Sequence, residues 1–377
     1  MKVLICVESL NVGGIETWLK NLVFVNQGVK FDFFVQHKNG YYEKEIKSKG
    51  CRVFHSKPQS IFDKLLQFVG LSTSSVHSSF RTILSKESFD VVHVNGTEFM
   101  GDFLKIANEY NVPKRIAHCH TTGINKFNSS IKMRMRGLRF VTIDRARLNK
   151  HATNLLSCSN ESAAFFLGSE GAKKKLSTVI YCGVPTVSNF NNVERDTYGI
   201  PGNAKVIGHV GTFSEVKNHR FIVDLFSELL KTDRQYYLFL AGDGYLHEEI
   251  KLHCKKLGVF EQVIMPGHCK DIPSLMVSIF DMLILPSHYE GMPLVAVEAI
   301  NVGLKVLCSD TITKDLTDYF SERIETASLN ANHSLWTSKI HSCIDSKIEP
   351  EKGRAIVEAS RFSINSSYDR LVQIYKS

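Results

Sequence analysis

The chain has 377 residues, of which 43% are hydrophobic and 22% are charged. Its length is about two to three times that of a typical domain, and its composition is that of a soluble globular enzyme, which excludes a disordered chain, a fibrous protein and a disulfide-stapled miniprotein. The net charge of +8 suggests a polyanionic partner, namely nucleic acid, anionic lipid or a phosphorylated substrate.

Short apolar runs alternate with helical patterns along the whole chain. In the first half, such runs predict strands at residues 3–7, 31–35, 91–94, 115–118, 154–157 and 179–181. In the second half, they predict strands at 205–210, 237–241, 262–265, 282–286 and 305–308. This alternation predicts an α/β fold with parallel, doubly wound sheets.

One polar segment divides this series of elements. Residues 188–197 are rich in asparagine, and a new strand-like run starts at Lys205. We therefore place a domain boundary near 184–203, with one domain at 1–185 and a second at 186–360. Two such sheets facing one another would bind a ligand between the carboxyl ends of their strands.

Signals for export or membrane insertion are weak. The apolar run at 3–7 is too short for the hydrophobic region of a signal peptide, and no segment approaches the roughly 18 apolar residues of a membrane span. Nine cysteines without a C-x-x-C pair indicate reduced thiols in a cytosolic protein and give little support for structural zinc. The serine-rich segment 72–79 is expected to be a mobile loop.

Glycine-rich turns follow three of the predicted strands. Gly13 and Gly14 open into a helix whose first amides favour an anion, although a tight turn explains them equally well. Residues 241–244 (Ala-Gly-Asp-Gly) are best explained as a turn. Gly211 is followed six residues later by Lys217, which could neutralise a phosphate leaving group. The alternative for this lysine is a solvated surface position.

Two glutamates eight residues apart are the most informative feature. Glu290 follows a predicted strand, Gly291 permits a sharp turn, and Pro293 suits the first turn of a helix. Glu298 lies farther along that helix among apolar residues, where a carboxylate is costly without a polar partner. The first carboxylate could orient a reacting sugar, and the second could hold vicinal hydroxyls such as those of a ribose. Alternatively, Glu298 interacts with the helix dipole and Glu290 is a loop charge.

Positive charge is concentrated in residues 126–150, which contain eight Lys or Arg residues and one acid. Ile131, Met135 and Leu138 recur there at helical spacing, which predicts a basic amphipathic helix that could lie on anionic lipid or guide a lipid-linked diphosphate acceptor. The side chains expected to face the membrane or acceptor are Lys132, Arg134, Arg136 and Arg139. A solvated charged helix is the alternative. Nucleic acid is less favoured, because no aromatic residues are interleaved with the basic ones.

The segments that share motifs with a known family are 13–14, 115–120, 157–159, 180–184, 211–219, 241–244, 267–268 and 290–298. Over nearly its whole length, the chain resembles the retaining nucleotide-sugar transferases of glycosyltransferase family 4. The most specific motif is the E-x7-E signature formed by Glu290 and Glu298. Within the family, the chain looks like bacterial transferases that build capsular or exopolysaccharide repeat units. The resemblance implies a GT-B fold, with two doubly wound Rossmann-like domains facing a central cleft and a C-terminal helix at 361–377 that crosses back to the N-terminal domain.

The resemblance also implies a role for each candidate residue. Glu290 would contact hydroxyls of the donor sugar, Glu298 the nucleotide ribose, and Lys217 the diphosphate. His120 would lie beside the donor sugar, and the backbone near His268 would meet the base. The catalytic residues would be Glu290, His120 and Lys217. The other donor-binding positions would be Gly13, Gly14, Gly211, Thr212, Gly291, Met292, Pro293 and Leu294.

One departure from the family pattern concerns the phosphate site. The position after Gly211 is usually arginine and is Thr212 here, so diphosphate stabilisation could be weaker by on the order of a few kcal/mol unless Arg220 or another basic residue compensates. No D-x-D pair occurs, which fits a metal-independent mechanism. We expect no cofactor. The substrate would be a nucleotide sugar, and we expect its nucleotide to be UDP. His93 and His118, which belong to strand-like runs, are expected to be structural.

We therefore expect a retaining, metal-independent transferase of hexosyl or N-acetylhexosaminyl type. It would move a sugar from a nucleotide diphosphate to a hydroxyl of a glycan, a lipid-linked intermediate of cell-surface polysaccharide synthesis. It would be cytoplasmic and peripheral on the inner face of the cell membrane, bound to anionic lipid and not to nucleic acid. The alternatives are a catalytically weak nucleotide-sugar-binding subunit and a nucleotide-sugar 2-epimerase of the same architecture.

Overall fold

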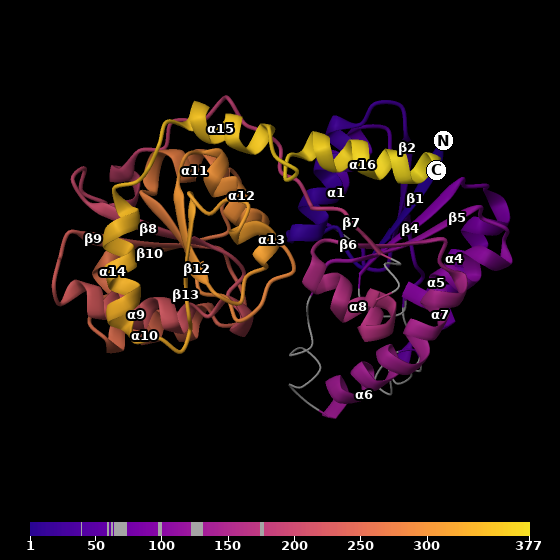
Figure 1. The fold of residues 1–377 in the computed structure, drawn as a ribbon, viewed down its shortest axis with the longest axis horizontal. Coiled ribbons are helices and arrows are strands. Elements are labelled where there is room, and N and C mark those ends of the chain that lie inside the picture. The colour runs from indigo at the N-terminus through magenta and orange to yellow at the C-terminus, as the bar shows by residue number, and fades with distance from the viewer. Residues whose placement is uncertain are drawn as a thin grey trace. The chain divides into compact units, whose positions relative to one another are not determined.

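The computed structural model describes residues 1–38, 40–58, 60–61, 63, 74–96, 100–121, 131–173 and 177–377. This part of the chain forms two compact units (Figure 1). The first unit comprises residues 1–183 together with 364–377, and the second comprises 184–363. The C-terminal helix therefore belongs to the first unit.

The first unit is built on a parallel sheet of seven strands in the order β3-β2-β1-β4-β5-β6-β7. Its strands are β1 (Lys2–Val7), β2 (Lys30–Val35), β3 (Val53–His55), β4 (Val91–Gly96), β5 (Lys114–Cys119), β6 (Asn154–Ser157) and β7 (Ser177–Val179). Its helical elements are α1 (Gly14–Val25), α2 (Glu43–Ser48), α4 (Ser74–Lys86), α5 (Met100–Glu109), α6 (Ile131–Arg139), the π-helical η2 (Phe140–Asp144), α7 (Arg145–His151), α8 (Asn160–Lys173) and α16 (Ile364–Lys376). The central strands β1 and β4 are buried along almost their whole length, as expected for parallel strands covered by helices on both faces.

Helix α4 begins within the serine-rich segment 72–79. Val76 and Phe80 are buried, and the ring of Phe80 lies 5.2 Å from that of Phe34 and 5.1 Å from that of Phe103, measured between centroids. The expectation of a mobile loop is therefore wrong for the described part of this segment. Val76 and Phe80 recur at helical spacing, so this face of the helix joins the core, where Ser79 is also buried, while Ser78 is exposed.

Helix α16 is bound to the first unit by side chains that lie far away in the sequence. Trp18 in α1 donates its indole N–H to Ser367 Oγ at 3.0 Å, and the Tyr375 hydroxyl lies 2.7 Å from His93 Nδ1 in β4. All four side chains are buried. These contacts make the last helix part of the core of the first unit rather than a loose tail.

The second unit contains a parallel sheet of six strands in the order β10-β9-β8-β11-β12-β13. Its strands are β8 (Lys205–Val210), β9 (Tyr236–Ala241), β10 (Val263–Gly267), β11 (Met282–Leu285), β12 (Lys305–Ser309) and β13 (Ile324–Ala327). Its helical elements are η3 (Arg195–Tyr198), η4 (Glu215–Lys217), α9 (His219–Leu230), α10 (His247–Lys256), η5 (Phe260–Gln262), α11 (Ile272–Ile279), α12 (Leu294–Asn301), α13 (Lys314–Thr317), α14 (His333–Ile344) and α15 (Pro350–Glu358). One large buried cluster, which includes Trp336 and Phe226, fills the space between sheet and helices.

Strand order reverses once in each sheet, between β1 and β4 in the first unit and between β8 and β11 in the second. At such a point the loops that follow the two strands diverge to opposite faces of the sheet and leave a crevice at the carboxyl ends, where α/β proteins bind ligands. Gly13 and Gly14 follow β1, Gly211 follows β8 and the Glu290 segment follows β11, and these strands border the two points. The topology therefore predicts one candidate site in each unit.

All nine cysteines lie in the described part of the chain, and each is a free thiol. Eight are buried and Cys269 is partly exposed.

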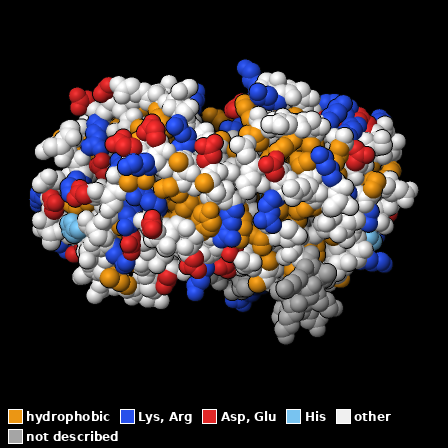
Figure 2. Space-filling model, turned by 45° about the horizontal axis from the view of Figure 1, so that its top comes forward, with side chains coloured by type: hydrophobic (Ala, Val, Ile, Leu, Met, Phe, Trp, Pro, Cys, Tyr) orange, Lys and Arg blue, Asp and Glu red, His pale blue; other side chains and the backbone are white. Residues whose placement is uncertain are grey.

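None of the helices that the structure describes is both long and apolar enough to cross a membrane. On the face shown in Figure 2, basic and acidic side chains are interspersed.

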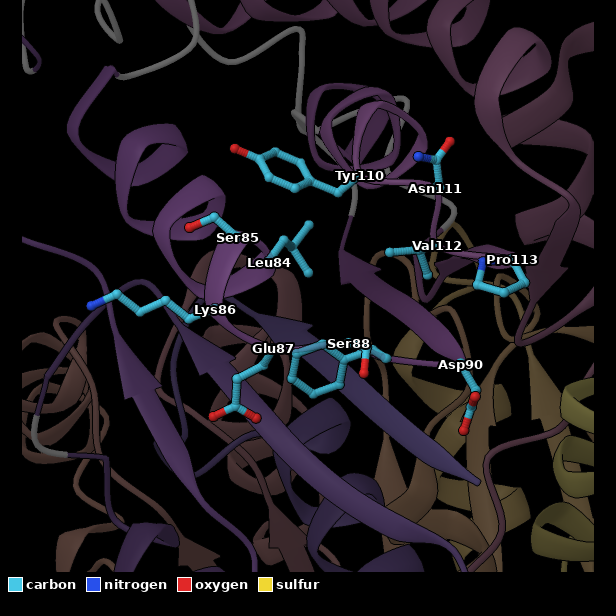
Figure 3. A pocket seen from close by; sticks show the side chains of 11 residues that line it. Leu84, Ser85, Lys86, Glu87, Ser88, Asp90, Tyr110, Asn111, Val112 and Pro113 are labelled. Atoms are coloured by element: carbon cyan, nitrogen blue, oxygen red, sulfur yellow. The ribbon is translucent and has the colours of Figure 1, made fainter.

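A cavity of about 510 Å³ lies in the first unit and is lined by residues 84–90 and 110–113 (Figure 3). These segments directly precede β4 and β5. The cavity is therefore at the amino-terminal edge of the sheet, opposite the carboxyl ends where the strand order favours ligand binding. We do not include it in the candidate site.

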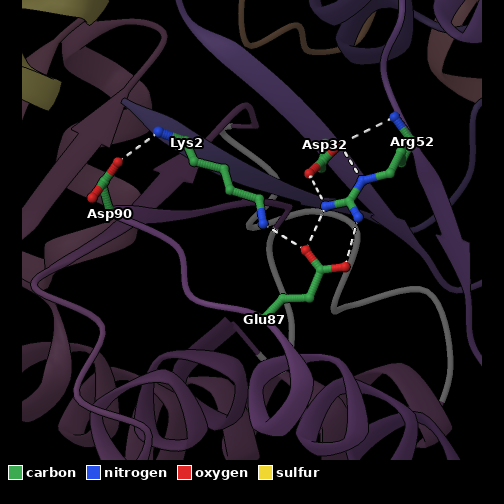
Figure 4. Close-up of polar contacts among 5 residues, drawn as sticks. All are labelled: Lys2, Asp32, Arg52, Glu87 and Asp90. Atoms are coloured by element: carbon green, nitrogen blue, oxygen red, sulfur yellow. Dashed lines mark hydrogen bonds and ion pairs between the residues drawn. The ribbon is translucent and has the colours of Figure 1, made fainter.

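A network of charged side chains ties together the amino ends of the strands in the first unit (Figure 4). Arg52 donates to both carboxylate oxygens of Glu87, at 2.6 and 2.5 Å, and to both oxygens of the fully buried Asp32, at 3.2 and 2.7 Å. Lys2 donates its Nζ to Glu87 at 2.5 Å and its backbone N–H to Asp90 at 2.6 Å. The hydrogen bonds to Arg52, which have the largest effect, and to Lys2 lower the pKa of the Glu87 carboxyl to about 2.

Replacing Glu87 by glutamine is expected to lower the stability of the protein at neutral pH and to reduce its sensitivity to acid. Because the folded-state pKa of Glu87 is depressed, its stabilising effect is full above the ordinary value near 4.5 and is lost as the pH falls toward about 2. We expect a loss of about 1 kcal/mol at pH 7, or a melting temperature lower by roughly 2–4 °C. Thermal unfolding followed between pH 7 and pH 3 measures this change. A mutant and a wild type that lose stability in parallel over this range would contradict the prediction.

Candidate active site

Lys217 and Glu290 meet at the switch point of the second unit. Lys217 ends η4 in the loop after β8, and Glu290 lies in the loop after β11. Lys217 Nζ lies 2.5 Å from Glu290 Oε1, and Ser287 Oγ donates to the same carboxylate oxygen at 3.0 Å. The side chains of Lys217 and Glu290 are only 21% and 15% exposed, so this ion pair is well shielded from water. The structure therefore brings together two of the three residues predicted to be catalytic.

Backbone and side-chain hydrogen bonds fix the two loops independently of that ion pair. The backbone N–H of His288 donates to Val216 O at 2.8 Å, and Asn218 Nδ2 donates to Pro286 O at 3.2 Å. A second set holds the loop after β11 from the other side, with Ser309 Oγ and Thr311 Oγ1 donating to Ser287 O at 2.6 and 2.7 Å. Such cross-bracing preorganises the loops around the charged pair.

Three glycine positions let the strand ends of the second unit approach closely. A Cβ atom on Gly242, which has a φ of +140°, would lie 2.1 Å from Gly211 O, and one on Gly244 would lie 2.4 Å from Phe213 O. A Cβ on Gly211 would lie 3.3 Å from the Cδ and Cε atoms of Lys217, whose stem therefore packs against this glycine. These contacts lie within the segment 241–244, for which the sequence predicts a turn. The glycines are needed for backbone packing beside the lysine.

The other predicted donor-binding residues of the second unit lie on the same edge of the sheet. Met292 and Pro293 precede α12, Leu294 opens it, and Glu298 lies in its second turn, partly exposed. His268 follows β10 and is exposed. The structure therefore places these residues after strands β10 and β11, at the carboxyl ends where Lys217 and Glu290 also lie.

Arg220, the residue that could replace the missing arginine, pairs with an acidic residue of α10. Thr212 is exposed, whereas the guanidinium of Arg220 forms an ion pair with Glu249 of α10 at 3.8 Å. Lys217 is thus the basic residue that the structure places at the Glu290 carboxylate.

Two buried imidazoles beneath the glycine loop were not predicted as part of the site. His209 Nδ1 donates to the carbonyl oxygen of Ile284 at 2.8 Å, so the proton of the neutral ring is on Nδ1. Burial lowers the pKa of His209 to about 4. The ring of His219 stacks on Phe213 with centroids 4.0 Å apart. Both histidines are therefore neutral near pH 7 and act as packing groups below the Lys217 loop. His209 lies inside an apolar run, which gave no signal for this placement, whereas His219 closes the segment 211–219 that is shared with the family.

In the first unit, the glycine turn after β1 is occupied by a carboxylate of its own helix. A Cβ on Gly13 would lie within 2.4 Å of Glu16 Oε2, and Ser9 Oγ donates to Glu16 Oε1 at 3.3 Å. Burial raises the pKa of Glu16. Gly14 itself is exposed, with open space where a side chain would be. Gly13 thus leaves room for the acidic residue in the first turn of α1, a favourable position for a carboxylate.

His120 lies just after β5 with partners at both ring nitrogens. Its Nε2 donates to Asn95 Oδ1 at 2.9 Å, so Nδ1 is the unprotonated nitrogen and lies 3.4 Å from Cys182 Sγ. Burial lowers the pKa of His120 to about 3, which keeps the ring neutral. The rings of His118 and Trp18 lie 4.0 and 5.4 Å from it between centroids. A neutral imidazole held in this way is suited to contact a ligand rather than to exchange protons.

The prediction that Arg139 faces a membrane or acceptor is wrong. Its side chain is only 7% exposed and donates to Asp102 Oδ2 of α5 at 2.7 Å, and Arg147 binds the other oxygen of the same carboxylate. A buried guanidinium requires such partners, so Arg139 anchors α6 to the core. Arg134 is exposed, as predicted, whereas the side chains of Lys132 and Arg136 lie outside the described residues.

The outer surface of α6 and η2 is apolar as well as basic. Leu138 is 67% exposed and Val141 is 51% exposed, and Met135 and Ile143 are also exposed. Large exposed apolar side chains near a basic residue are found on helices that lie on membranes. We call these four residues the α6 apolar surface.

Comparisons with known proteins agree with this architecture. The family described as "Glycosyltransferase Family 4" matches residues 12–187, and the family described as "Glycosyl transferases group 1" matches residues 190–330. A protein of Bacillus subtilis (strain 168) that carries the provisional name glycosyltransferase EpsF is 30% identical over 350 residues, which cover 90% of this chain and 86% of that protein.

Solved glycosyltransferase structures share the fold. HepE of Anabaena in complex with UDP has a TM-score of 0.76 and 19% sequence identity, and the similarity covers 100% of both chains. The same protein in complex with UDP-glucose has a TM-score of 0.75 and 19% identity, covering 100% of this chain and 99% of that one. WaaG, a glycosyltransferase involved in lipopolysaccharide biosynthesis, has a TM-score of 0.76 and 15% identity, covering 100% of both chains. Together with the EpsF match, these similarities show that the chain belongs to glycosyltransferase family 4 and is a GT-B glycosyltransferase resembling bacterial enzymes of exopolysaccharide synthesis.

Proposed function

We propose that this glycosyltransferase takes its sugar from a nucleotide diphosphate, with UDP as the carrier, and transfers it to a hydroxyl of a glycan with retention of configuration. The observation that carries the proposal is the shielded Lys217–Glu290 pair at the switch point of the second unit. A cation for a leaving diphosphate and a carboxylate for sugar hydroxyls lie there within hydrogen-bond distance of one another. HepE, which shares the fold, was solved with UDP and with UDP-glucose.

In the proposed reaction, the bond between the anomeric carbon and the diphosphate oxygen breaks, and the acceptor oxygen bonds to the anomeric carbon on the same face. The acceptor proton passes to the departing diphosphate. Lys217 stabilises the charge that develops on the diphosphate, and Glu290 orients the sugar. Glu298 holds the ribose, and the segment from Gly291 to Leu294 supplies amides to the diphosphate.

The remaining predicted residues have lesser roles in this proposal. His120 contacts the donor sugar through a ring that burial keeps neutral. Gly211 and Thr212 line the phosphate site, and the backbone near His268 meets the base. Gly13 and Gly14 complete the diphosphate cradle, although the Glu16 carboxylate beside Gly13 disfavours direct anion contact at that glycine.

We further propose that the acceptor is lipid-linked and that the protein works at the inner face of the cell membrane as a peripheral protein. The α6 apolar surface supports this, because Leu138 and Val141 could enter the interfacial region of a bilayer while Arg134 meets anionic headgroups. The cluster of Arg139, Arg147 and Asp102 fixes the helix to α5, so the apolar side chains stay turned outward.

Serine substitutions of both Leu138 and Val141 are expected to weaken binding to anionic vesicles by about tenfold or more, because two exposed apolar side chains would no longer be buried in lipid. Sedimentation with phosphatidylcholine vesicles containing phosphatidylglycerol measures this binding. Leu252→Ser in α10 is the matched control, since Leu252 is 64% exposed on the second unit. Vesicle binding unchanged by the double substitution would contradict the membrane proposal.

The proposed activity is tested by supplying a panel of UDP-, GDP- and ADP-linked hexoses and N-acetylhexosamines, with and without EDTA, and following release of free nucleotide. We expect free nucleotide to be released only when an acceptor is present, and to be released in the presence of EDTA as well. A second candidate function is that of a nucleotide-sugar-binding subunit with little turnover. It is favoured by Thr212, which is exposed and stands where the family has an arginine. Tight binding of a nucleotide sugar without transfer or hydrolysis would support that candidate.

A further inference from the structure

We propose that Glu290 makes the enzyme discriminate between the intact donor and the free nucleoside diphosphate product, because its carboxylate competes with phosphate for Lys217. This inference rests on the proposed function and adds a specificity to the same site. Lys217 Nζ is bound to Glu290 Oε1 at 2.5 Å. A diphosphate that takes Lys217 as its counter-ion must first displace this carboxylate.

The displacement needs only side-chain movement. The loops after β8 and β11 stay joined by the bond from His288 N to Val216 O and by that from Asn218 Nδ2 to Pro286 O, neither of which involves the charged pair. The Lys217 stem is held against Gly211, so the terminal ammonium turns from the carboxylate to a phosphate without moving the backbone. The exchange of partners can therefore occur within a rigid frame.

The displaced carboxylate determines which ligand binds well. Glu290 is 15% exposed, and a carboxylate shielded from water to that degree is costly when it loses a charged hydrogen bond. Ser287 Oγ, which is fully buried, keeps one hydrogen bond to it and holds it in place. The hydroxyls of a bound sugar restore the lost hydrogen bonds. Free UDP has no sugar hydroxyls to offer at that position, so it binds at a net cost and leaves after transfer.

Glu290→Gln separates these effects in a binding measurement. The amide oxygen can accept only a weaker hydrogen bond from the ammonium, without the attraction between opposite charges, so free UDP should bind Glu290→Gln about tenfold to a hundredfold more tightly than wild type, a range typical of one charge-assisted hydrogen bond. Isothermal titration with UDP and with a UDP-sugar gives both affinities. The preference of wild type for the UDP-sugar over UDP should be largely lost in this variant.

The matched control is Glu215→Gln, which removes the same charge from an exposed residue two positions before Lys217. It should change UDP affinity by less than about threefold if direct competition rather than net charge is responsible. A second variant, Glu290→Asp, keeps the charge on a shorter side chain and should give an intermediate UDP affinity. Unchanged or weaker UDP binding by folded Glu290→Gln would overturn the inference, as would an equal gain from Glu215→Gln. Absence of nucleotide binding by wild type and all variants would instead refute the proposed function.

Discussion

Replacing Lys217 by methionine is expected to lower kcat/KM for the nucleotide-sugar donor by about 10²–10³-fold, the loss typical of one electrostatic group at a developing anion. Negative charge grows on the diphosphate as the glycosidic bond breaks, so a nearby ammonium stabilises the transition state more than the bound donor. The site is shielded from water, which strengthens this interaction. Methionine retains the long flexible stem that packs against Gly211 but lacks the charge.

The size of this effect depends on Thr212. A neighbouring arginine would share the diphosphate charge, but this chain has threonine there and Arg220 is engaged with Glu249. We therefore expect the upper end of the range. Initial rates with saturating acceptor measure the loss, and Lys217→Arg, which keeps the charge, should retain much more activity than Lys217→Met. Turnover of Lys217→Met within threefold of wild type, with unchanged thermal unfolding, would contradict the role of Lys217.

The sequence was a good guide to central strands and a poor guide to sheet edges. The buried strands β1, β4, β8 and β11 carry continuous apolar runs, and each was predicted to within one or two residues. The edge strands β3 and β13 were missed, and β7 was placed two residues too late. Edge strands are short and partly polar because one side lacks a neighbouring strand, as Glu325 and Thr326 in β13 illustrate. Apolar runs therefore detect edge strands less reliably, although the edge strand β10 was predicted, at 262–265.

The candidate site was predictable in its residue types but not in its contacts. Glycine, proline and carboxylate spacing placed Glu290 at a strand end, and the family resemblance assigned Lys217 to the same ligand. That the two side chains bind each other depends on β8 and β11 being neighbours in the sheet, a long-range pairing that local patterns do not contain. The same limit applies to His120, whose neutral form follows from burial against Asn95 and Cys182.

Arg139 shows how a correct local pattern leads to a wrong orientation. Its spacing puts it on the same helical stripe as other basic residues of 126–150, so the sequence predicts a solvent- or lipid-facing side chain. Asp102 lies 37 positions earlier, and α5 brings its carboxylate against α6. The buried ion pair places Arg139 in the core, while the apolar residues Leu138 and Val141 are exposed. Only the tertiary structure shows which stripe of this helix faces outward.

Glu290→Ala is expected to reduce kcat by about 10²-fold or more, with a smaller effect on the apparent KM for the donor. The carboxylate is held by Ser287 in a loop braced from both sides, so it can accept sugar hydroxyls without reorganising during the reaction. Alanine removes those hydrogen bonds and also frees Lys217, which should strengthen product inhibition. Rates must therefore be taken at low conversion.

Glu298→Gln is the comparison that separates chemistry from binding. Glu298 lies on α12 eight residues farther along the chain, and as a ribose-binding residue it would contact a part of the donor that does not react. Interactions with such a part are equal in ground and transition states, so their loss raises KM and leaves kcat nearly unchanged. The two variants should thus differ in which constant changes. Normal turnover by both variants would contradict the assignment. A loss of kcat in Glu298→Gln equal to that in Glu290→Ala would also contradict it, because a carboxylate at the reacting sugar and one at the distant ribose hydroxyls should not have the same effect on kcat.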